Sequence, residues 1–341
     1  METDYDVVIV GAGPAGLSCA KELRGSNLKV LLVEKNKVIG PKVCAGGITL
    51  KDLKEIPKEI LDAVFNKVYA HYKNKTVLVE RNYDLIATID REKLGQYQLN
   101  QINKFDNTKI LTGISVTKIN PDNSLILSSG EEIKFEFLVG ADGSNSIVRN
   151  FLKLPTKKIG ICIQYILPKN LGNFELYLNN TLFGAAYLWI FPHQNYTSVG
   201  CGMSLEKMNT KKLRDNFEIW LRERGIDLTG AKFEAGIINY DYQGYKFKNI
   251  FLAGDAAGLT SGLTGEEIYT AIISGKQIAK EILELDNSKN LITEWLIQKA
   301  RQEKYLFFLR RPSYFKHLLF SLFMKLIRSE KIQDKIIDLL T

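Results

Sequence analysis

The sequence has few of the residues on which metal and disulfide chemistry depend. Its 341 residues include only three histidines, His71, His193 and His317, which lie far apart without ligand spacing, so we expect no metal site. The four cysteines are widely spaced and form no CxxC pair, which argues against both a disulfide framework and a zinc site. We therefore expect free thiols in a reducing cytoplasm.

Long apolar runs are also missing. No run reaches the roughly 18 residues that a membrane span needs, and the acidic start METDYDVVIVGAG argues against a cleaved signal peptide. The net charge is +8, and residues 299–341 alone hold ten Lys or Arg against four Asp or Glu. No recognised nucleic-acid-binding module accompanies this charge, so we expect no nucleic-acid partner.

The N-terminal end carries a glycine-rich turn. An apolar strand at residues 6–10 runs into Gly11, Gly13 and Gly16 of a G-x-G-x-x-G motif, which also contains Ala15. Such glycines allow a tight turn, close approach to a pyrophosphate, and close packing of helix on strand. A second strand ends at Glu34, followed by Lys35, where a carboxylate can bind ribose hydroxyls. Strand, glycines, helix, strand and acid in this order predict a dinucleotide site.

Two distant segments extend this site. In KNIFLAGDAAGLTSGLTGEEI, a strand at residues 250–253 is followed by Gly254, Asp255 and a long helix, whose positive N-terminal dipole would suit an anionic reduced flavin. In EFLVGADGS, Asp142 and Gly143 follow another strand. Both ends of the chain therefore build one elongated cofactor site.

These three segments together resemble the FAD-dependent oxidoreductases of the p-hydroxybenzoate hydroxylase fold, over nearly the whole chain. KVCAGGI is similar to the KPCGG signature of the geranylgeranyl reductase family, with Lys42 and Cys44 in register, while Val43 and Ala45 depart from it. YLWIFP at residues 187–192 resembles that family's Y-x-W-x-F-P motif, and the Leu-Thr-Gly-Glu turn at residues 263–266 resembles its helix start.

The resemblance implies an α/β (α+β) fold. A discontinuous Rossmann-like FAD-binding domain would comprise residues 1–66, 86–156 and 245–285, with a helical stretch near 51–65. An inserted antiparallel β-sheet domain for the substrate would comprise residues 67–85 and 157–244, a region with strand periodicity. Residues 286–341 would form a C-terminal helical region.

The resemblance also implies the site residues. Cys44 would face the flavin and the substrate, whereas the residues alone favour a small buried residue at a turn. Arg91 is in register for the cofactor's phosphates in an R-x-x-F-D-x-x-L-like helix, in which Gly95 replaces the usual aspartate. The expected catalytic residues are Cys44, Tyr187 and Trp189. The expected cofactor-binding residues are Gly11, Gly13, Ala15, Gly16, Glu34, Lys35, Lys42, Cys44, Ala45, Gly46, Arg91, Asp142, Gly143, Gly254, Asp255, Gly262, Thr264 and Gly265.

The function so implied is saturation of C=C bonds in a polyprenyl chain of geranylgeranyl type on a lipid, chlorophyll or quinone, by hydride transfer from reduced FAD. A single glycine fingerprint leaves no separate nicotinamide domain, so NADPH or NADH would visit the flavin transiently, or reduced ferredoxin would supply electrons. Two alternatives stay open: a flavin-dependent monooxygenase or halogenase of the same fold, and a flavin or lipid carrier without turnover.

The C-terminal tail mixes Phe, Leu and Ile with Arg310, Arg311, Lys316, Lys325 and Arg328. Basic amphipathic helices of this kind bind anionic membrane surfaces, but many pack on their own domain with a solvated basic face. We expect a monomer in the cytoplasm, with peripheral contact between this tail and the inner face of the membrane.

Overall fold

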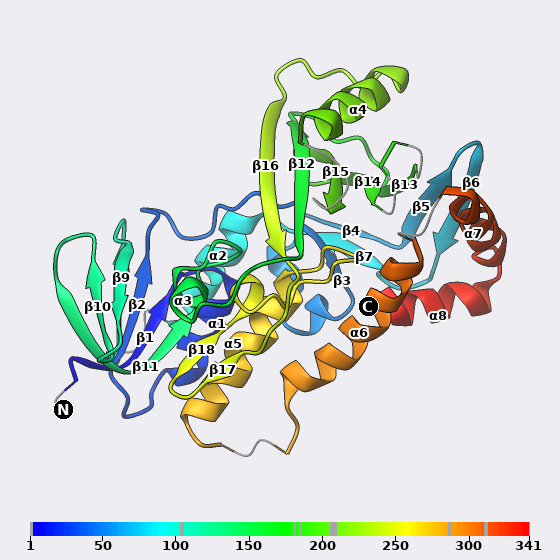
Figure 1. The fold of residues 1–341 in the computed structure, drawn as a ribbon. Helices are drawn as coiled ribbons and strands as arrows, with labels where there is room; N and C mark the ends of the chain where they lie inside the picture. Colours follow the sequence, from blue (N-terminus) through cyan, green and yellow to red (C-terminus); the bar gives the residue numbers. More distant parts are fainter. Residues whose placement is uncertain are drawn as a thin grey trace.

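Two large β-sheets organise the structure (Figure 1). The coordinates are a computed structural model, which describes residues 3–102, 106–179, 182–183, 186–204, 210–285, 288–309 and 313–340. Arg310 and Arg311 of the tail lie outside these ranges, and the side chains of Lys316 and His317 are likewise not described.

The first sheet brings together the strands expected to bind the cofactor. Its order is β17-β18-β11-β1-β2-β8, and β10 pairs with both β11 and β9. Strands β1, β2, β8, β11 and β18 run parallel, with Val10 beside Gly140 and Gly140 beside Leu252. The bounds are β1 Tyr5–Val10, β2 Val30–Glu34, β8 Thr108–Thr112, β9 Val116–Asn120, β10 Ser124–Leu127, β11 Glu132–Gly140, β17 Lys246–Phe247 and β18 Ile250–Leu252.

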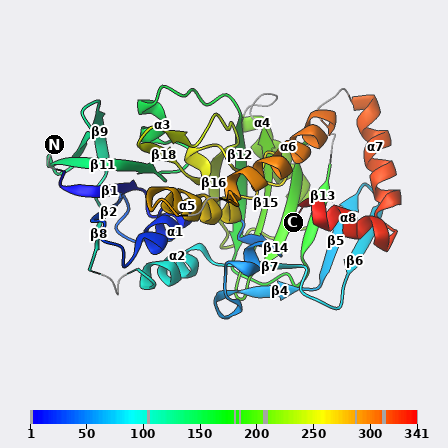
Figure 2. The ribbon, with the colours of Figure 1, turned by 90° about the horizontal axis from the view of Figure 1, so that it is seen from below.

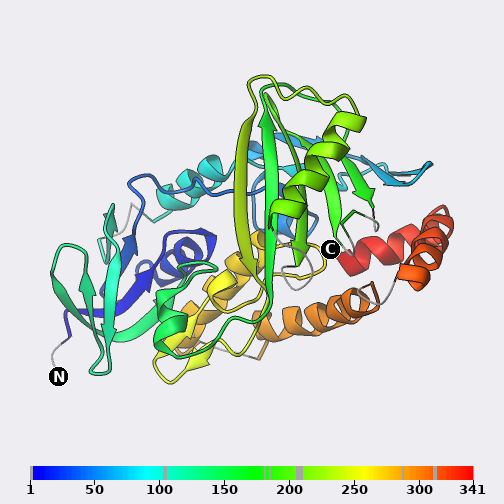
Figure 3. The ribbon, with the colours of Figure 1, turned by 45° about the horizontal axis from the view of Figure 1, so that its top comes forward.

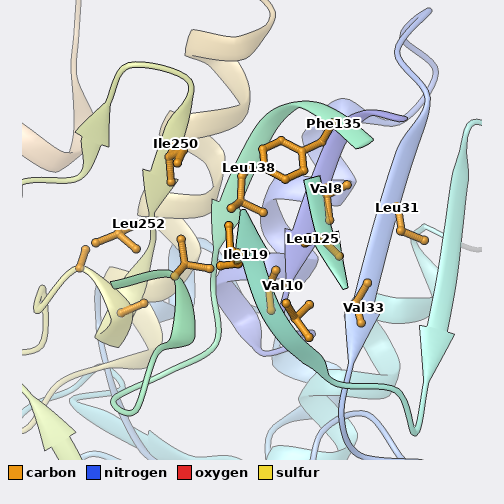
Figure 4. Packing of buried hydrophobic residues seen from close by; sticks show 14 of the residues in the cluster. Val8, Val10, Leu31, Val33, Ile119, Leu125, Phe135, Leu138, Ile250 and Leu252 are labelled. Atoms are coloured by element: carbon orange, nitrogen blue, oxygen red, sulfur yellow. The ribbon is translucent and has the colours of Figure 1, made fainter. Parts of the chain in front are cut away.

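Successive side chains along these strands point to opposite faces of the sheet, and both faces are buried. Val8 and Val10 point to one face, where they pack with residues of β2, β10, β11 and β18 (Figure 4). Val7 and Ile9 point to the other face, which α1 (Pro14–Leu23) and α5 (Ile268–Ile282) cover. Burial on both sides explains why these strands read as continuous apolar runs. Helices α2 (Arg91–Asn100) and α3 (Ile147–Phe151) lie beside the same sheet.

The second sheet has the order β16-β12-β15-β14-β13-β5-β6. Its neighbours are antiparallel except for the parallel pair β13 and β5. The bounds are β5 Lys67–Tyr72, β6 Lys75–Glu80, β12 Ile159–Leu167, β13 Glu175–Leu178, β14 Tyr187–Pro192, β15 Thr197–Ser204 and β16 Lys232–Asn239. Helix α4 (Thr210–Glu223) lies across one face of this sheet (Figure 3). The sequence analysis did not predict α4, although Leu213, Phe217 and Leu221 repeat every four residues.

A small third sheet of β3 (Gly47–Thr49), β7 (Ile86–Thr88) and β4 (Ala63–Phe65) follows the cysteine loop. The helical stretch predicted near residues 51–65 is wrong. This segment contains two short 3₁₀ turns, η1 (Asp52–Lys54) and η2 (Lys58–Ile60), and then β4. Pro57 lies between the turns, and because proline lacks an N–H and disfavours a helical residue before it, it interrupts a longer helix.

The chain ends in α6 (Leu291–Leu309), α7 (Ser313–Leu326) and α8 (Glu330–Leu340). Helix α6 leads away from the first sheet, and α7 and α8 lie beside β5 and β6 (Figure 2). Phe320 and Met324 of α7 pack with Tyr72 of β5, and Arg81 forms an ion pair with Asp334 of α8 at 2.6 Å. Helices α7 and α8 are therefore docked on the second sheet.

Helices α1 and α5 approach so closely that Gly275 has no room for a side chain. A Cβ atom there would overlap the carbonyl oxygen of Ala15 and lie 2.9 Å from the Cys19 nitrogen. We predict that Gly275→Ala destabilises the protein, because overpacking costs about 1–3 kcal/mol and exceeds the gain of about 1 kcal/mol in helix propensity. Denaturant unfolding would measure this, with Lys280→Ala, at a partly exposed position of the same helix, as the control. Greater stability of Gly275→Ala would contradict the packing argument.

Candidate functional site

A cavity of about 480 Å³ opens at the carboxyl edge of the parallel strands. Most of the cofactor-binding residues expected from the sequence line it. These residues are Gly11, Gly13, Ala15, Glu34, Lys35, Lys42, Arg91, Asp142, Gly143, Gly254 and Asp255.

The glycines of the first turn differ in what surrounds them. A Cβ atom at Gly11, whose φ is +102°, would overlap the carbonyl oxygen of Ala141, and one at Gly16 would overlap that of Gly11. Gly16 therefore allows α1 to pack closely on the turn, and it does not line the cavity. Gly13 begins α1 without a side-chain cap, and a Cβ atom there would meet nothing within 4 Å. The first N–H groups of α1 are thus open to an anion such as a pyrophosphate.

Glu34 is held by the backbone at the end of β2. Its Oε2 accepts a hydrogen bond from the Ala12 N–H at 2.8 Å, and its Oε1 accepts one from the Asn36 N–H at 2.9 Å. Each carboxylate oxygen can accept a further hydrogen bond. The side chain is thereby oriented toward the cavity with capacity left for ribose hydroxyls.

Asp142 follows strand β11, which pairs with β1, and it lines the same cavity. Its Oδ2 accepts a hydrogen bond from the Ile147 N–H at 2.7 Å, whereas Oδ1 is buried without a hydrogen-bond partner in the structure. Burial raises the pKa of this carboxyl, although hydrogen bonds from Ser146 and the backbone act against it. A buried acceptor without a partner is costly, and a ligand donor would satisfy it.

The charged side chains of Lys42, Arg91, Asp255 and Glu267 lie close together in the cavity. Lys42 Nζ lies 3.2 Å from Asp255 Oδ2 and 3.0 Å from Glu267 Oε2, and Arg91 Nη1 lies 3.1 Å from Glu267 Oε1. Burial opposes the charge on Lys42, but Asp255 and Glu267 outweigh it and raise the pKa of Lys42. Burial likewise opposes charge on Asp255, yet Lys42, Thr260 and Ser144 lower its pKa below the ordinary value.

Glu267 was not predicted as a site residue. It lies at the start of α5, and its partners are 225 and 176 residues away in the sequence. An acidic residue at a helix start is ordinarily interpreted as favourable to the helix dipole. The available signal was Glu267 itself, a second acid directly after the Leu-Thr-Gly-Glu turn that ends at Glu266.

Cys44 lies next to this charged cluster but does not line the cavity. Its Sγ accepts a hydrogen bond from the Gly46 N–H at 3.4 Å, and its carbonyl oxygen accepts one from Gln164 Nε2 at 3.2 Å. Burial raises the pKa of the thiol, while Arg91, which contacts it, acts in the opposite direction. The neutral thiol is therefore the favoured form at pH 7.

His193 hydrogen-bonds to the loop that contains Cys44. The sequence analysis did not assign this residue to the site. The buried imidazole lies between the Asp62 carboxylate, at 2.8 Å from Nδ1, and the Ala45 carbonyl oxygen, at 3.0 Å from Nε2. A Cβ atom at Gly46, whose φ is +75°, would lie 2.5 Å from the same ring. Within the described part of the chain, His, Cys, Asp and Glu form no group that could hold a metal ion.

Aromatic residues of β14 form a wall behind the loop. Trp189 and Phe191 pack with Phe174, and Ala45, Cys162 and Tyr187 border them. This aromatic wall comprises Phe174, Tyr187, Trp189 and Phe191. Tyr177 and Phe183 pack with α4 on the opposite face of the second sheet.

The polar atoms of the aromatic wall are paired. Tyr187 donates its hydroxyl to the Thr264 carbonyl oxygen at 2.6 Å, and Trp189 donates its indole N–H to Ser198 Oγ at 2.8 Å. The ring of Trp189 would overlap a Cβ atom at Gly200, which explains a glycine in the next strand. Thr264 and Gly265 lie at the contact with Tyr187, whereas Gly262 faces Tyr240 and Leu306, and none of the three lines the cavity.

Two acidic side chains, Asp52 and Glu266, lie close together beside the Leu-Thr-Gly-Glu turn at residues 263–266. Glu266 is 6% exposed; Thr49 Oγ1 donates to its Oε1 at 3.4 Å, and Lys51 Nζ lies 3.5 Å from Oε2. Thr49 Oγ1 also lies 3.0 Å from Asp52 Oδ2. Burial, and then the charge of Asp52, raise the pKa of Glu266 to about 8, and burial raises that of Asp52 to about 6.

Comparisons with known proteins identify the family. The family model described as pyridine nucleotide-disulphide oxidoreductase matches residues 5–158. An uncharacterized protein of Methanosarcina barkeri is 30% identical over 88% of this chain and 80% of its own length. The digeranylgeranylglycerophospholipid reductase of Methanocaldococcus jannaschii is 27% identical over 98% of this chain and 89% of its own length. The chain belongs to the geranylgeranyl reductase family.

Solved structures agree with this fold. A geranylgeranyl bacteriochlorophyll reductase-like protein from Thermoplasma acidophilum has a TM-score of 0.81 at 20% identity, covering 95% of this chain and 91% of its own. The p-nitrophenol 4-monooxygenase PnpA from Pseudomonas putida has a TM-score of 0.75 at 13% identity, covering 99% and 97%. The predicted fold class, a Rossmann-like domain combined with a second β-sheet, is confirmed.

The predicted cofactor, FAD, fits the cavity of this reductase-family chain. The open N-terminus of α1 suits a pyrophosphate, and Glu34 suits a ribose. The Asp142 Oδ1 and Arg91 Nε atoms, both buried without hydrogen-bond partners, suit further polar groups of a ligand.

The protonated state of Glu266 predicts a pH dependence of stability. Because its pKa is raised in the folded chain, folding takes up a proton, so stability falls as pH rises from about 4.5 to about 8. One such proton changes the unfolding free energy by up to about 1.4 kcal/mol per pH unit. We predict that Glu266→Gln flattens this decline between pH 6 and 8, above the range in which Asp52 contributes. Denaturant unfolding across pH would test this.

Glu294→Gln is the matched control for this experiment, because Glu294 lies half-exposed on α6. It should leave the pH dependence as in the wild-type protein. An unchanged slope in Glu266→Gln would show that Glu266 is ionised in the folded chain.

Proposed function

We propose that this protein is an FAD-dependent reductase that saturates C=C bonds of a polyprenyl chain of geranylgeranyl type, carried on a lipid, chlorophyll or quinone. The observation that carries the proposal is the contact between the dinucleotide cavity and the aromatic wall. Arg91 lines the cavity and contacts Cys44, and the loop of Cys44 borders the wall through Ala45. The names of the relatives supply the substrate class.

The cofactor, when bound, would supply hydride from its reduced ring. The chain's residues bind and orient it: the α1 N-terminus with Gly11 and Gly13 at the pyrophosphate, Glu34 and Lys35 at one ribose, and Asp255 at the opposite end. We assign residues 67–85 and 157–244 to the substrate domain, because they supply the second sheet that carries the wall.

The aromatic wall would exclude water from the reacting double bond. Since Tyr187 and Trp189 already donate to Thr264 and Ser198, neither has an unpaired donor to offer to a substrate. Burial raises the pKa of Tyr187 well above its ordinary value, so this hydroxyl stays protonated. We therefore propose that Tyr187 and Trp189 position the substrate, and that the neutral thiol of Cys44 faces the reacting end.

Cys44→Ser tests this mechanism. The variant should keep its fold and FAD, because the side chains are similar in size, yet reduce prenyl saturation at least tenfold, which is about 1.4 kcal/mol in the barrier. The assay is anaerobic turnover of a digeranylgeranylglycerophospholipid by chemically reduced enzyme, with products detected by mass spectrometry as gains of two hydrogens per bond. A melting curve and FAD content are measured on the same samples.

Cys201→Ser is the matched control, because Cys201 is a buried thiol packed under α4, on the face of the sheet opposite the aromatic wall. Normal turnover in a stable, FAD-loaded Cys44→Ser would remove Cys44 from the mechanism. Oxygen-dependent hydroxylation or halogenation by the wild type, without prenyl saturation, would favour the monooxygenase or halogenase alternative. Binding of FAD and lipid without any turnover would favour a carrier.

Peripheral membrane contact through the C-terminal helices is also proposed. Leu318, Leu322 and Leu326 of α7 are 67%, 47% and 43% exposed and repeat every four residues, next to the exposed Lys325 and Arg328. A basic helix with an exposed apolar stripe binds anionic membrane surfaces. No described helix is long and apolar enough to cross a bilayer. Cytoplasmic location, a monomeric state and the nature of the electron donor stay predictions.

We predict that Leu318→Asp combined with Leu322→Asp weakens binding to anionic vesicles at least tenfold without loss of fold, since both side chains are exposed. Vesicle co-sedimentation would measure it, and high salt should weaken wild-type binding. Ile219→Asp, at a 42% exposed position of α4, is the control. Unchanged binding of the double variant would contradict contact through α7. Truncation within α6 would be unsuitable, because Trp295 there is buried.

A further inference from the structure

The carboxylate of Glu267 lies where the cavity meets the amino terminus of α5. Glu267 is the N-cap residue of this helix, but its side chain accepts no capping hydrogen bond from the helix. It lines the cavity, is 10% exposed, and binds Lys42 at 3.0 Å and Arg91 at 3.1 Å. The carboxylate is therefore directed to the cations of the cofactor site rather than to its own helix.

The cluster formed by Glu267 and the charged side chains around it carries no net charge. Lys42 and Arg91 contribute two positive charges, and Asp255 and Glu267 contribute two negative ones. Arg91 is 7% exposed, lines the cavity, and has an Nε atom without a hydrogen-bond partner, so it has a donor left for a ligand. Without Glu267, this end of the cavity would carry one net positive charge.

The negative charge of Glu267 also offsets the positive charge at the N-terminal end of the α5 dipole. A helix N-terminus carries about half a positive charge, which favours an anion in front of it. The Glu267 carboxylate lies at the same point, so its negative charge acts against that half charge. The Glu267 carboxylate is buried. Its charge therefore interacts with its neighbours more strongly than it would in water, because charges at short distance interact more strongly in a buried site.

We propose that Glu267 lowers the reduction potential of the bound FAD. On two-electron reduction with uptake of one proton, the cofactor gains one negative charge, which a nearby carboxylate disfavours. A lower potential makes the reduced cofactor a stronger hydride donor, as an unactivated alkene requires. This inference rests on the proposed function, because it requires that FAD occupies the cavity.

The test is the FAD midpoint potential of the holoprotein, measured by dithionite titration beside a reference dye and followed by flavin absorbance. In Glu267→Gln the ratio of reduced to oxidised FAD at a fixed potential should rise at least tenfold, which is about 30 mV for a two-electron couple. Lys42→Gln removes a positive charge from the same cluster, so the ratio should fall, at least threefold. Opposite signs in the two variants would identify a charge effect.

Glu281→Gln is the matched control. Glu281 is another buried acid of α5, 5% exposed and bound to Lys246, but it lies at the opposite end of the helix. Its potential should equal that of the wild type. If Glu267→Gln does not fold or retain FAD, Lys42→Gln decides alone: a lower potential supports the inference and an unchanged one overturns it.

The outcomes separate this inference from the function on which it rests. Wild-type protein that retains FAD, with the same potential in both variants, overturns the role of Glu267 and leaves the proposed function standing. Wild-type protein that takes up no FAD overturns both.

Discussion

The parallel registration of β1, β11 and β18 is the constraint on which the rest of the site depends. Val10 lies beside Gly140, and Gly140 beside Leu252, so the three strands end level with one another. The segments that follow them are more than a hundred residues apart in sequence, yet each begins at the same edge of the sheet. Parallel strands bring their carboxyl ends to one edge, and open α/β sheets bind ligands there. The close contact of α1 with α5 then fixes the helix starts that face the cavity, because Gly275 lets the two backbones meet.

The loop of Cys44 is one of the contacts that join the second sheet to this edge, beside those of Ser144 with Ile237 and of Asn239 with Asp255. Gln164 of β12 and His193 after β14 hydrogen-bond to the carbonyl oxygens of Cys44 and Ala45, while Arg91 contacts the thiol from the side of the cavity. Three elements therefore hold the loop in place, and two of them belong to the aromatic wall's own sheet. The departure at Gly95 has a related cause. A Cβ atom there would overlap Gly40, so α2, which presents Arg91, packs directly on the turn that leads into the loop.

The features that could be predicted from the sequence are those encoded locally. Gly11, Gly13 and Glu34 lie within one strand-helix-strand unit, and the spacing of that unit determines where they meet. The features that were missed depend on contacts between distant segments. Glu267 finds Lys42 and Arg91, and His193 finds Asp62, only after the sheets have formed. Helix α4 was missed for a different reason: its apolar period is helical, but it lies inside a region whose composition favours strands. The helix predicted near residues 51–65 is wrong because Pro57 interrupts the segment, which forms two 3₁₀ turns and a strand.

The two sides of the Cys44 loop differ in how their polar groups are satisfied. On the cavity side, Asp142 Oδ1 and Arg91 Nε are buried without partners. On the wall side, Tyr187 and Trp189 both donate to groups of the protein itself. Buried polar atoms are costly when unpaired, so the first side favours a polar ligand that supplies the missing partners, and the second favours an apolar one that requires none. A molecule with a charged dinucleotide end suits the cavity, and an isoprenoid chain suits the wall. The loop of Cys44 lies between the two, since its thiol contacts Arg91 of the cavity and Ala45 borders the wall.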